Sequence, residues 1–265
     1  MGNMLIGFNN YSDGSAVVFS GGSWSLALTK LAGPIVTDRA RSADLTLTNS
    51  QFRVDLGTSR SLKLIALTHT NFTSAALYKI TWYSDAYTTA VGNTGWLAVP
   101  GYPADDPDFI GAAVFHVFTD AISYRYWKIE IDDNANTDLY VEIGRLFMPE
   151  ELGMSRNPDV SVPDELEPNT PRQNSLGGTG YFNRRKPVRK LTFGYSLLDE
   201  TEAPRIRRFR KICNLNKQIV VIPDPDDTTN FNDRNFVATL NSMPKIGLMA
   251  AGLISGDGFD LIEVV

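Results

Sequence analysis

Few residues in this sequence have the chemistry to act on a ligand, and most of them lie in predicted turns. His69 and His116 are the only histidines, and no HExxH-like spacing is present. Carboxylates cluster at 105–108, 132–133 and 224–227, but none of these clusters follows the EF-hand pattern that would hold calcium. We therefore expect structural histidines, solvated carboxylates, no catalytic residue, no metal site and no cofactor.

Aromatic residues in loops offer a different chemistry, because a ring can stack on a bound ligand. Residues 87–108 are rich in Gly, Pro, Asn and Asp, which predicts a surface loop system rather than core. The alternative is that these rings pack against a neighbouring subunit or against the linker that follows. The candidate ligand-binding residues are Trp24, Tyr87, Trp96 and Tyr102.

Basic residues at 184–190 and 205–211 form the clearest charge feature of a chain whose net charge is -5. A guanidinium pairs well with carboxylates, so we expect this band to meet acidic residues at 159–167 of a neighbouring subunit. A solvated helix face is the alternative. Nucleic-acid binding is disfavoured because interleaved aromatic residues for base stacking are sparse. The predicted interface residues are Arg184, Arg185, Lys186, Arg205, Arg208 and Lys211.

Period-two alternation of apolar residues predicts a mainly β protein. The segment Phe52–Asp85 reads as three short strands in succession, with breaks at Gly57 and at 68–71, and these strands form a meander. Residues 124–131 also alternate, with one strongly apolar side. The hydrophobic fraction of 43% is enough for ordinary packed cores, and the aromatic fraction of 11% favours β-structure.

Composition divides the chain into three parts. Residues 1–149 are predicted to be a β-sandwich, 150–183 a Pro- and Gly-rich linker or arm, and 184–265 a smaller α+β assembly domain. The last part contains a predicted amphipathic helix, with Ile206, Phe209 and Cys213 at i, i+3 and i+7. The single cysteine excludes an internal disulfide. We expect no membrane span, because no apolar run approaches about 18 residues, and no signal peptide.

Four segments form a recognisable set: Phe52–Gly57, Ile65–Leu67 with Asn71, Tyr126–Ile131 and Glu142–Leu146. Together they resemble the galactose-binding-like jelly rolls of the discoidin kind, in the form found in bacteriophage tail proteins. This resemblance implies an eight-stranded sandwich whose end loops carry any ligand site. The C-terminal segments 189–193, 205–211 and 219–225 resemble small β-rich domains of tail-tip and baseplate proteins, including distal tail proteins.

The two resemblances imply a structural component of a phage tail tip or baseplate. Such a protein would be assembled in the host cytoplasm and reside in the virion tail, as a homo-oligomeric ring with other tail proteins as partners. The jelly roll would contact a host-surface glycan. The alternative is a carbohydrate-binding module for host adsorption. A third hypothesis, a glycan hydrolase, has no residue to which we can assign catalysis.

Overall fold

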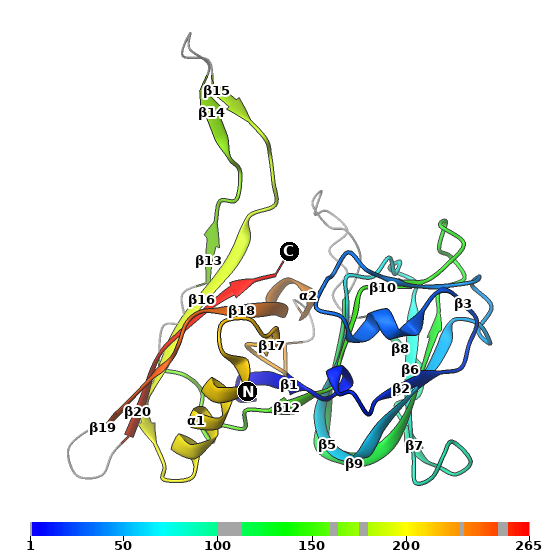
Figure 1. Ribbon diagram of the computed structural model, residues 1–265, viewed down its shortest axis with the longest axis horizontal. Helices are drawn as coiled ribbons and strands as arrows, with labels where there is room; N and C mark the ends of the chain where they lie inside the picture. The colour runs from blue at the N-terminus through cyan, green and yellow to red at the C-terminus, as the bar shows by residue number, and fades with distance from the viewer. Residues whose placement is uncertain are drawn as a thin grey trace. The chain divides into compact units, whose positions relative to one another are not determined.

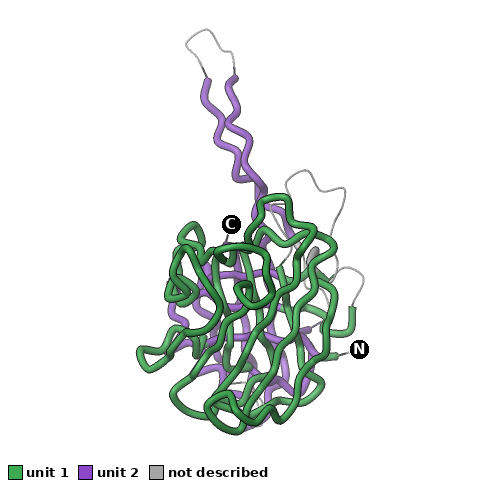
Figure 2. Tube along the Cα trace, turned by 90° about the vertical axis from the view of Figure 1, so that its right-hand side faces the viewer, with its two compact units in different colours: residues 1–2, 9–151, 222–235 green, residues 3–8, 152–221, 236–265 purple. Residues whose placement is uncertain are grey.

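The computed structural model describes residues 2–99, 113–159, 164–174, 180–227, 231–248 and 254–264. The chain forms two compact units (Figure 2): unit 1 is residues 1–2, 9–151 and 222–235, and unit 2 is residues 3–8, 152–221 and 236–265. This division differs from the predicted one in three respects. Residues 3–8 belong to unit 2, and so does most of the predicted linker 150–183. Residues 222–235, which the prediction placed in the C-terminal domain, belong to unit 1.

Unit 1 is built from two antiparallel sheets (Figure 1). The larger sheet has the order β11-β5-β9-β6-β7, with β2 paired to β5 and β8 paired to β6. Its strands are β2 (Val18–Ser20), β5 (Gln51–Thr68), β6 (Leu77–Tyr83), β7 (Ala90–Asn93), β8 (Leu97–Ala98), β9 (Val114–Asp132) and β11 (Arg145–Phe147). The smaller sheet consists of β3 (Trp24–Leu26), β4 (Ala40–Ser42) and β10 (Glu142–Ile143).

Short elements complete unit 1. They are the 3-10 helices η1 (Tyr11–Asp13) and η2 (Leu28–Ala32), the strand β12 (Pro149–Glu151) and the single-turn helix α2 (Phe231–Arg234). Leu31 of η2 is completely buried in the core of the unit. Asn10 precedes η1 and accepts a hydrogen bond from the Ser12 N–H, so its side chain caps the turn.

The predicted three-strand meander is wrong. The segments at 52–56 and 62–67 belong to one strand, β5, and β6 pairs with β9 rather than with β5. The predicted break at Gly57 is not a strand end, because its positive φ of 74° accommodates a bulge in a strand that continues. The Asp55 Oδ1 accepts a hydrogen bond from the Gly57 N–H at 2.8 Å and braces that bulge.

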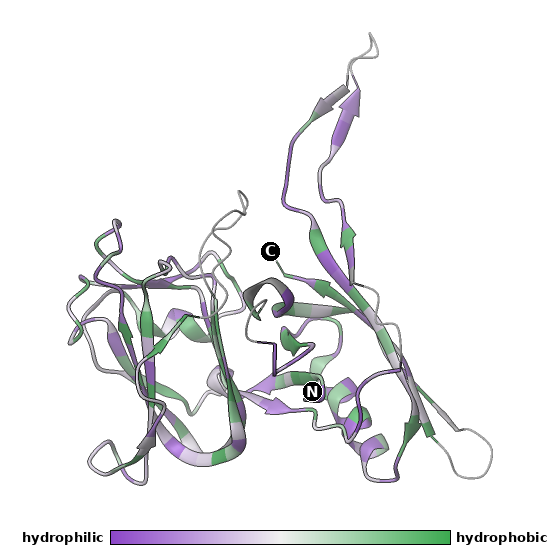
Figure 3. Cartoon of the chain, turned by 180° about the vertical axis from the view of Figure 1, so that it is seen from behind, coloured by the Kyte–Doolittle hydropathy of each residue, from purple (hydrophilic) through white to green (hydrophobic). Residues whose placement is uncertain are grey.

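The core of unit 1 lies on the inward side of the large sheet. Alternate residues of β5 and β9 supply fully buried side chains, among them Phe52, Val54, Trp127 and Ile129. Each large apolar side chain removed from water contributes about 1.5–3 kcal/mol. Figure 3 shows the consequence as short hydrophobic and hydrophilic stretches that follow one another along the strands. The outward side of this sheet is therefore free for polar and aromatic residues.

Unit 2 is a mainly antiparallel sheet covered by one long helix. Its strands follow the order β1-β17-β18-β20-β16-β13, with β19 paired to β20. They are β1 (Leu5–Asn10), β13 (Asp164–Glu167), β16 (Val188–Leu198), β17 (Ile219–Ile222), β18 (Phe236–Ser242), β19 (Lys245–Leu248) and β20 (Ile254–Glu263). The mainly β fold with one amphipathic helix, predicted from the sequence, is thus confirmed.

The helix α1 (Glu202–Cys213) packs its predicted apolar side on the core of unit 2. Ile206, Phe209 and Cys213 are all completely buried, and the Phe209 ring lies 5.7 Å from that of Phe259. A capping box begins the helix: the Asp199 Oδ1 accepts from the Glu202 N–H at 2.8 Å, and the Glu202 Oε2 accepts from the Asp199 N–H at 3.0 Å.

A two-stranded ribbon extends from the sheet of unit 2 where the linker was predicted (Figure 1). It continues β13 and β16 through β14 (Arg172–Asn174) and β15 (Gly180–Phe182), which pair with each other. We call residues 164–190 the arm. Three described segments of the predicted linker, 164–167, 172–174 and 180–182, are therefore paired β-structure, and they belong to unit 2.

Candidate functional site

The outward side of the large sheet of unit 1 gathers aromatic and charged residues. On β9, Tyr126, Lys128 and Glu130 alternate with the buried Trp127 and Ile129, so the first three point away from the core. We call this outward surface the aromatic face. Its members are Arg53, Asp55, Lys79, Tyr83, Tyr87, Trp96, Arg125, Tyr126, Lys128 and Glu130.

The strand register arranges the aromatic face in three rows that cross the sheet. Tyr126 belongs to the first row and Glu130 to the last, so these two rows lie about 13 Å apart along β9. The rows are Asp55, Tyr126 and Tyr83; then Ser20, Arg53, Lys128, Thr81 and Asn93; and finally Gln51, Glu130 and Lys79.

Tyr87 covers the first row from the turn between β6 and β7. Its ring lies 5.6 Å from that of Tyr83 and 5.4 Å from that of Tyr126, edge to face in both pairs. The Arg53 guanidinium carbon lies 5.0 Å from the centre of the Tyr87 ring, a cation–π contact. Burial raises the pKa of the Tyr87 hydroxyl well above its ordinary value.

Asp85 holds this turn in shape. Its carboxylate accepts hydrogen bonds from the N–H groups of Thr88 and Thr89 at 2.9 and 2.8 Å, and from the Thr89 hydroxyl at 2.9 Å. These bonds, above all the one from the Thr89 N–H, lower the pKa of Asp85. Tyr87 itself has a positive φ of 69°, which is uncommon for a residue with a side chain. The turn is therefore constrained so that the tyrosine folds back over the sheet.

Trp96 marks the opposite end of the aromatic face. Its side chain is 39% exposed, and the Lys79 Nζ lies 5.0 Å from its ring centre. Lys79 and Lys128 both bind the Glu130 carboxylate, at 2.9 and 2.8 Å. Burial opposes ionisation of Glu130, but the two ammonium groups prevail and keep the pKa of this carboxyl below its ordinary value.

A second ion pair fixes the first row. The Arg125 guanidinium donates two hydrogen bonds to the Asp55 carboxylate, at 2.5 and 2.8 Å. This bidentate pairing lowers the pKa of Asp55. Both carboxylates of the aromatic face are therefore committed to cations, and neither has the raised pKa that a general acid needs near neutral pH.

The four predicted ligand-binding residues separate in the structure. Tyr87 and Trp96 lie on the aromatic face. Trp24 instead packs inward: its ring meets that of Phe52 edge to face at 5.8 Å, and its Nε1 donates to the Gln51 carbonyl at 3.1 Å. Because β3 turns this half-buried ring towards the core, Trp24 does not join the other two, and its role in ligand binding stays a prediction. Tyr102 lies outside the described residues.

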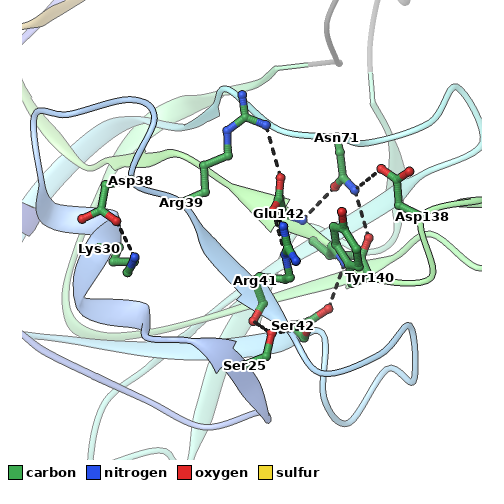
Figure 4. Close-up of polar contacts among 11 residues, drawn as sticks. Ser25, Lys30, Asp38, Arg39, Arg41, Ser42, Asn71, Asp138, Tyr140 and Glu142 are labelled. Atoms are coloured by element: carbon green, nitrogen blue, oxygen red, sulfur yellow. Dashed lines mark hydrogen bonds and ion pairs between the residues drawn. The ribbon is translucent and has the colours of Figure 1, made fainter.

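The loop-end residues of unit 1 form a polar network of their own (Figure 4). Arg41 and Arg39 pair with the two oxygens of the Glu142 carboxylate, at 2.5 and 3.2 Å. The Asn71 amide accepts from the Glu142 N–H at 2.7 Å and donates to Asp138 and to the Tyr140 carbonyl at 2.9 and 3.0 Å. These polar groups satisfy one another across three loops, so we assign the network to loop positioning.

Sequence reasoning missed eight members of the aromatic face: Arg53, Asp55, Lys79, Tyr83, Arg125, Tyr126, Lys128 and Glu130. The alternation at 124–131 was recognised, but only its apolar half was used to place the core. The polar half of the same alternation, with Tyr126, Lys128 and Glu130 on one side, is the signal that could have found them.

The predicted interface residues lie in two places within unit 2. Arg184 and Arg185 are exposed and Lys186 half-buried in the arm, whereas Arg205, Arg208 and Lys211 are exposed along α1. The acidic segment proposed to meet such residues in a neighbour is β13, which pairs with β16 of the same chain and sets Glu165 opposite Lys190. Their role between subunits remains a prediction.

The histidines take structural positions. The His116 Nδ1 lies 3.1 Å from the Tyr78 hydroxyl, and burial lowers the pKa of this histidine to about 4. His69 ends β5 with a positive φ of 55°. Within the described residues, no group of three or more His, Cys, Asp and Glu side chains could hold a metal ion. No helix in the same part of the chain is long and apolar enough to cross a membrane.

No protein-family model matches the sequence, and comparison with curated proteins finds no match. Among solved structures, the chain is similar to the family 32 carbohydrate-binding module of NanJ from Clostridium perfringens, solved with galactose. Sequence identity is 16%, the similarity covers 55% of this chain and 99% of that chain, and the TM-score is 0.40.

Two further structures are similar over about the same share of the chain. One is chitosan-binding module 1 of a chitosanase/glucanase from Paenibacillus sp. IK-5, with 18% identity, coverage of 52% of this chain and 97% of that chain, and a TM-score of 0.34. The other is a GH29 fucosidase from Ruminococcus gnavus, with 11% identity, coverage of 54% and 26%, and a TM-score of 0.39.

Proposed function

We propose that unit 1 is a non-catalytic carbohydrate-binding unit and that the aromatic face is its binding surface. The observation that carries this proposal is the placement of Trp96 and Tyr87 on one outward side of a single rigid sheet. Each ring marks one end of the face, about 13 Å apart along the strands, with donors between them. That spacing suits an extended oligosaccharide better than a single compact ligand.

The chemistry of the face matches what a sugar needs. Aromatic rings present flat apolar bodies on which the C–H side of a sugar ring can stack. Hydroxyl groups of the sugar need a few placed polar partners, which fix its orientation. Asn93 and Lys128 lie in the central row between the two aromatic ends and supply such partners.

The state of the carboxylates favours binding without hydrolysis. A glycosidase uses two carboxyl groups, and one of them must hold a proton near neutral pH. Asp55 and Glu130 are both ion-paired, and the pKa of each is lowered rather than raised. The face therefore lacks the proton donor for cleaving a glycosidic bond.

A glycan array probed with the full chain tests this proposal. We expect the parent protein to bind one class of glycan, and Trp96→Ala to reduce the binding strongly. Phe182→Ala is the matched control, because Phe182 is an aromatic residue in the arm that is more exposed than Trp96, at 66% against 39%. Absence of binding to every glycan, or equal binding by Trp96→Ala and the parent, would overturn the proposal.

We propose subunit assembly as a second candidate function, in a phage tail tip or baseplate. The arm favours it. Tyr181 and Phe182 are 63% and 66% exposed on a two-stranded ribbon, and such ribbons gain little stability by themselves. Exposed aromatic residues on a ribbon are suited to burial against a second copy of the chain. Tail proteins and a ring of copies would then be its partners, and the virion tail its location.

The mass of the protein in solution tests this second candidate. We expect light scattering at high concentration to give a multiple of the 29.3 kDa chain. A Tyr181→Ser, Phe182→Ser double variant should shift that mass towards the monomer, whereas Trp96→Ala should leave it unchanged. A parent protein that stays monomeric at high concentration contradicts the assembly role and leaves the glycan proposal intact.

A further inference from the structure

The central row of the aromatic face holds two basic residues on neighbouring strands and no acidic residue. Arg53 on β5 and Lys128 on β9 are direct cross-strand partners. Like charges directly opposite each other in an antiparallel pair are destabilising. The remaining members of the row are hydroxyl and amide residues: Ser20, Thr81 and Asn93.

The charges of the face do not balance. The Asp55 carboxylate is paired with Arg125, which donates two hydrogen bonds to it. Glu130 is shared between Lys79 and Lys128, so one carboxylate serves two ammonium groups. The face thus holds four cations and two carboxylates, on a chain whose net charge is -5.

Arg53 is the cation of the aromatic face whose guanidinium can still pair with an anion. Its side chain is exposed, and its described contact is with the Tyr87 ring at 5.0 Å. Among the residues that the structure describes, no carboxylate pairs with it. The cation–π contact with the Tyr87 ring leaves the N–H groups of the Arg53 guanidinium available. Such groups donate well to a carboxylate or a sulfate.

We propose that the aromatic face takes an anionic saccharide whose carboxylate or sulfate group lies between Arg53 and Lys128. This inference rests on the proposed function, since the rings at both ends supply the stacking that a free anion would not use. The anion would relieve the repulsion between the opposed cations. The sugar rings on either side of it would then extend towards Tyr87 and Trp96.

Calorimetric titration of the full chain with three tetrasaccharides tests the inference. The probes are a tetragalacturonate, a heparin-derived sulfated tetrasaccharide and neutral cellotetraose. We expect one or both anionic probes to bind more tightly than the neutral probe, and added salt to weaken that binding. The two anionic probes distinguish a carboxylate from a sulfate as the recognised group.

The variants locate the bound anion. Arg53→Gln should lower the affinity for the anionic probe about tenfold, as expected for a lost charge-assisted hydrogen bond. Lys128→Gln is a second variant in case the first does not fold, and thermal unfolding reports on the folding of both. Arg172→Gln is the matched control, because Arg172 stacks on Phe182 at 5.5 Å in the arm, and it should bind like the parent.

The outcomes separate the inference from the proposed function. Unchanged anionic binding in both Arg53→Gln and Lys128→Gln overturns the inference. Equal binding of neutral and anionic probes, lost in Trp96→Ala but kept in Arg53→Gln, also overturns it while the proposed function stands. If no saccharide binds here or on the glycan array, both fail.

Discussion

Arg53 and Lys128 face each other directly across β5 and β9, two cations in register on the outward side of one sheet. A sequence selected for stability alone would have an acidic residue at one of these two positions. The pair supports the proposed binding of an anionic ligand, and it connects the folding energetics of unit 1 with that proposed role.

The opposed cations lead to a prediction about stability. The free energy of unfolding should be higher for Arg53→Glu than for Arg53→Gln, by about 0.2–1 kcal/mol at low salt. The reason is that a glutamate opposite Lys128 is attracted to it, whereas a glutamine is neutral. Both variants lose the stacking on Tyr87, so their comparison isolates the charge. Urea denaturation at low and high salt measures the difference, which should shrink as salt screens it. An advantage that persists at high salt would mean that an electrostatic attraction to Lys128 is not its cause.

The turn held by Asp85 should matter for binding more than for folding. Asp85→Ala removes the acceptor of three hydrogen bonds and lets Tyr87 leave the sheet. We expect glycan affinity to fall about fivefold through lost preorganisation. Titration of the variant measures this loss, with Asp199→Ala at the start of α1 as a control. A variant with parental affinity would show that Tyr87 needs no support from this turn.

His116 should make the stability of unit 1 depend on pH. The folded protein protonates it at a pKa of about 4, whereas the unfolded chain does so near about 6.5. As pH falls from 7 to 5 the unfolded state therefore takes up the proton first, and stability drops by about 2 kcal/mol.

Urea midpoints at pH 7 and pH 5 test this pH dependence. His116→Phe should have a smaller drop between the two values, although its stability at pH 7 suffers from the loss of the Tyr78 contact. His69→Asn is the control, because asparagine tolerates the positive φ of 55° at that position. An equal drop in the parent and in His116→Phe contradicts the assignment.

The bulge at Gly57 gives a prediction about the fold itself. Gly57→Ala forces a side chain into positive φ and brings its Cβ to 3.1 Å from the Ala16 Cβ. Gly95→Ala imposes a similar φ but meets nothing within 4 Å. Both variants should lose about 1 kcal/mol to backbone strain, and Gly57→Ala should lose more. Thermal unfolding of the two variants measures the difference; equal losses would argue against close packing at the bulge.

The sequence pattern correctly predicted the helix in unit 2 and a strand at 124–131, because both are determined by residues that are close together in the chain. The i, i+3, i+7 spacing of Ile206, Phe209 and Cys213 placed the helix face, because a helix is defined by contacts within a few residues. The alternation at 124–131 placed a strand for the same reason. A glycine that permits positive φ, however, looks the same in a turn and in a bulge, so Gly57 was misread.

The proposed binding surface could not be predicted because it depends on pairing between distant segments. Arg53 and Lys128 are 75 positions apart in the sequence and meet only through the register of β5 with β9. Register is set by which faces are buried across the whole sheet, and no single segment encodes it. Trp24 and Trp96 illustrate the same limit: both lie near turns in the sequence, but only the fold decides which ring points outward.

The most direct measurement is an NMR titration of the full chain with a saccharide that binds on the glycan array. The indole N–H signals of its four tryptophans monitor the titration. Trp96→Ala assigns the signal of that residue. The account predicts that the Trp96 signal shifts as ligand is added, while that of Trp24, which donates to the Gln51 carbonyl, stays in place. A shift of the Trp24 signal with an unmoved Trp96 signal would contradict it.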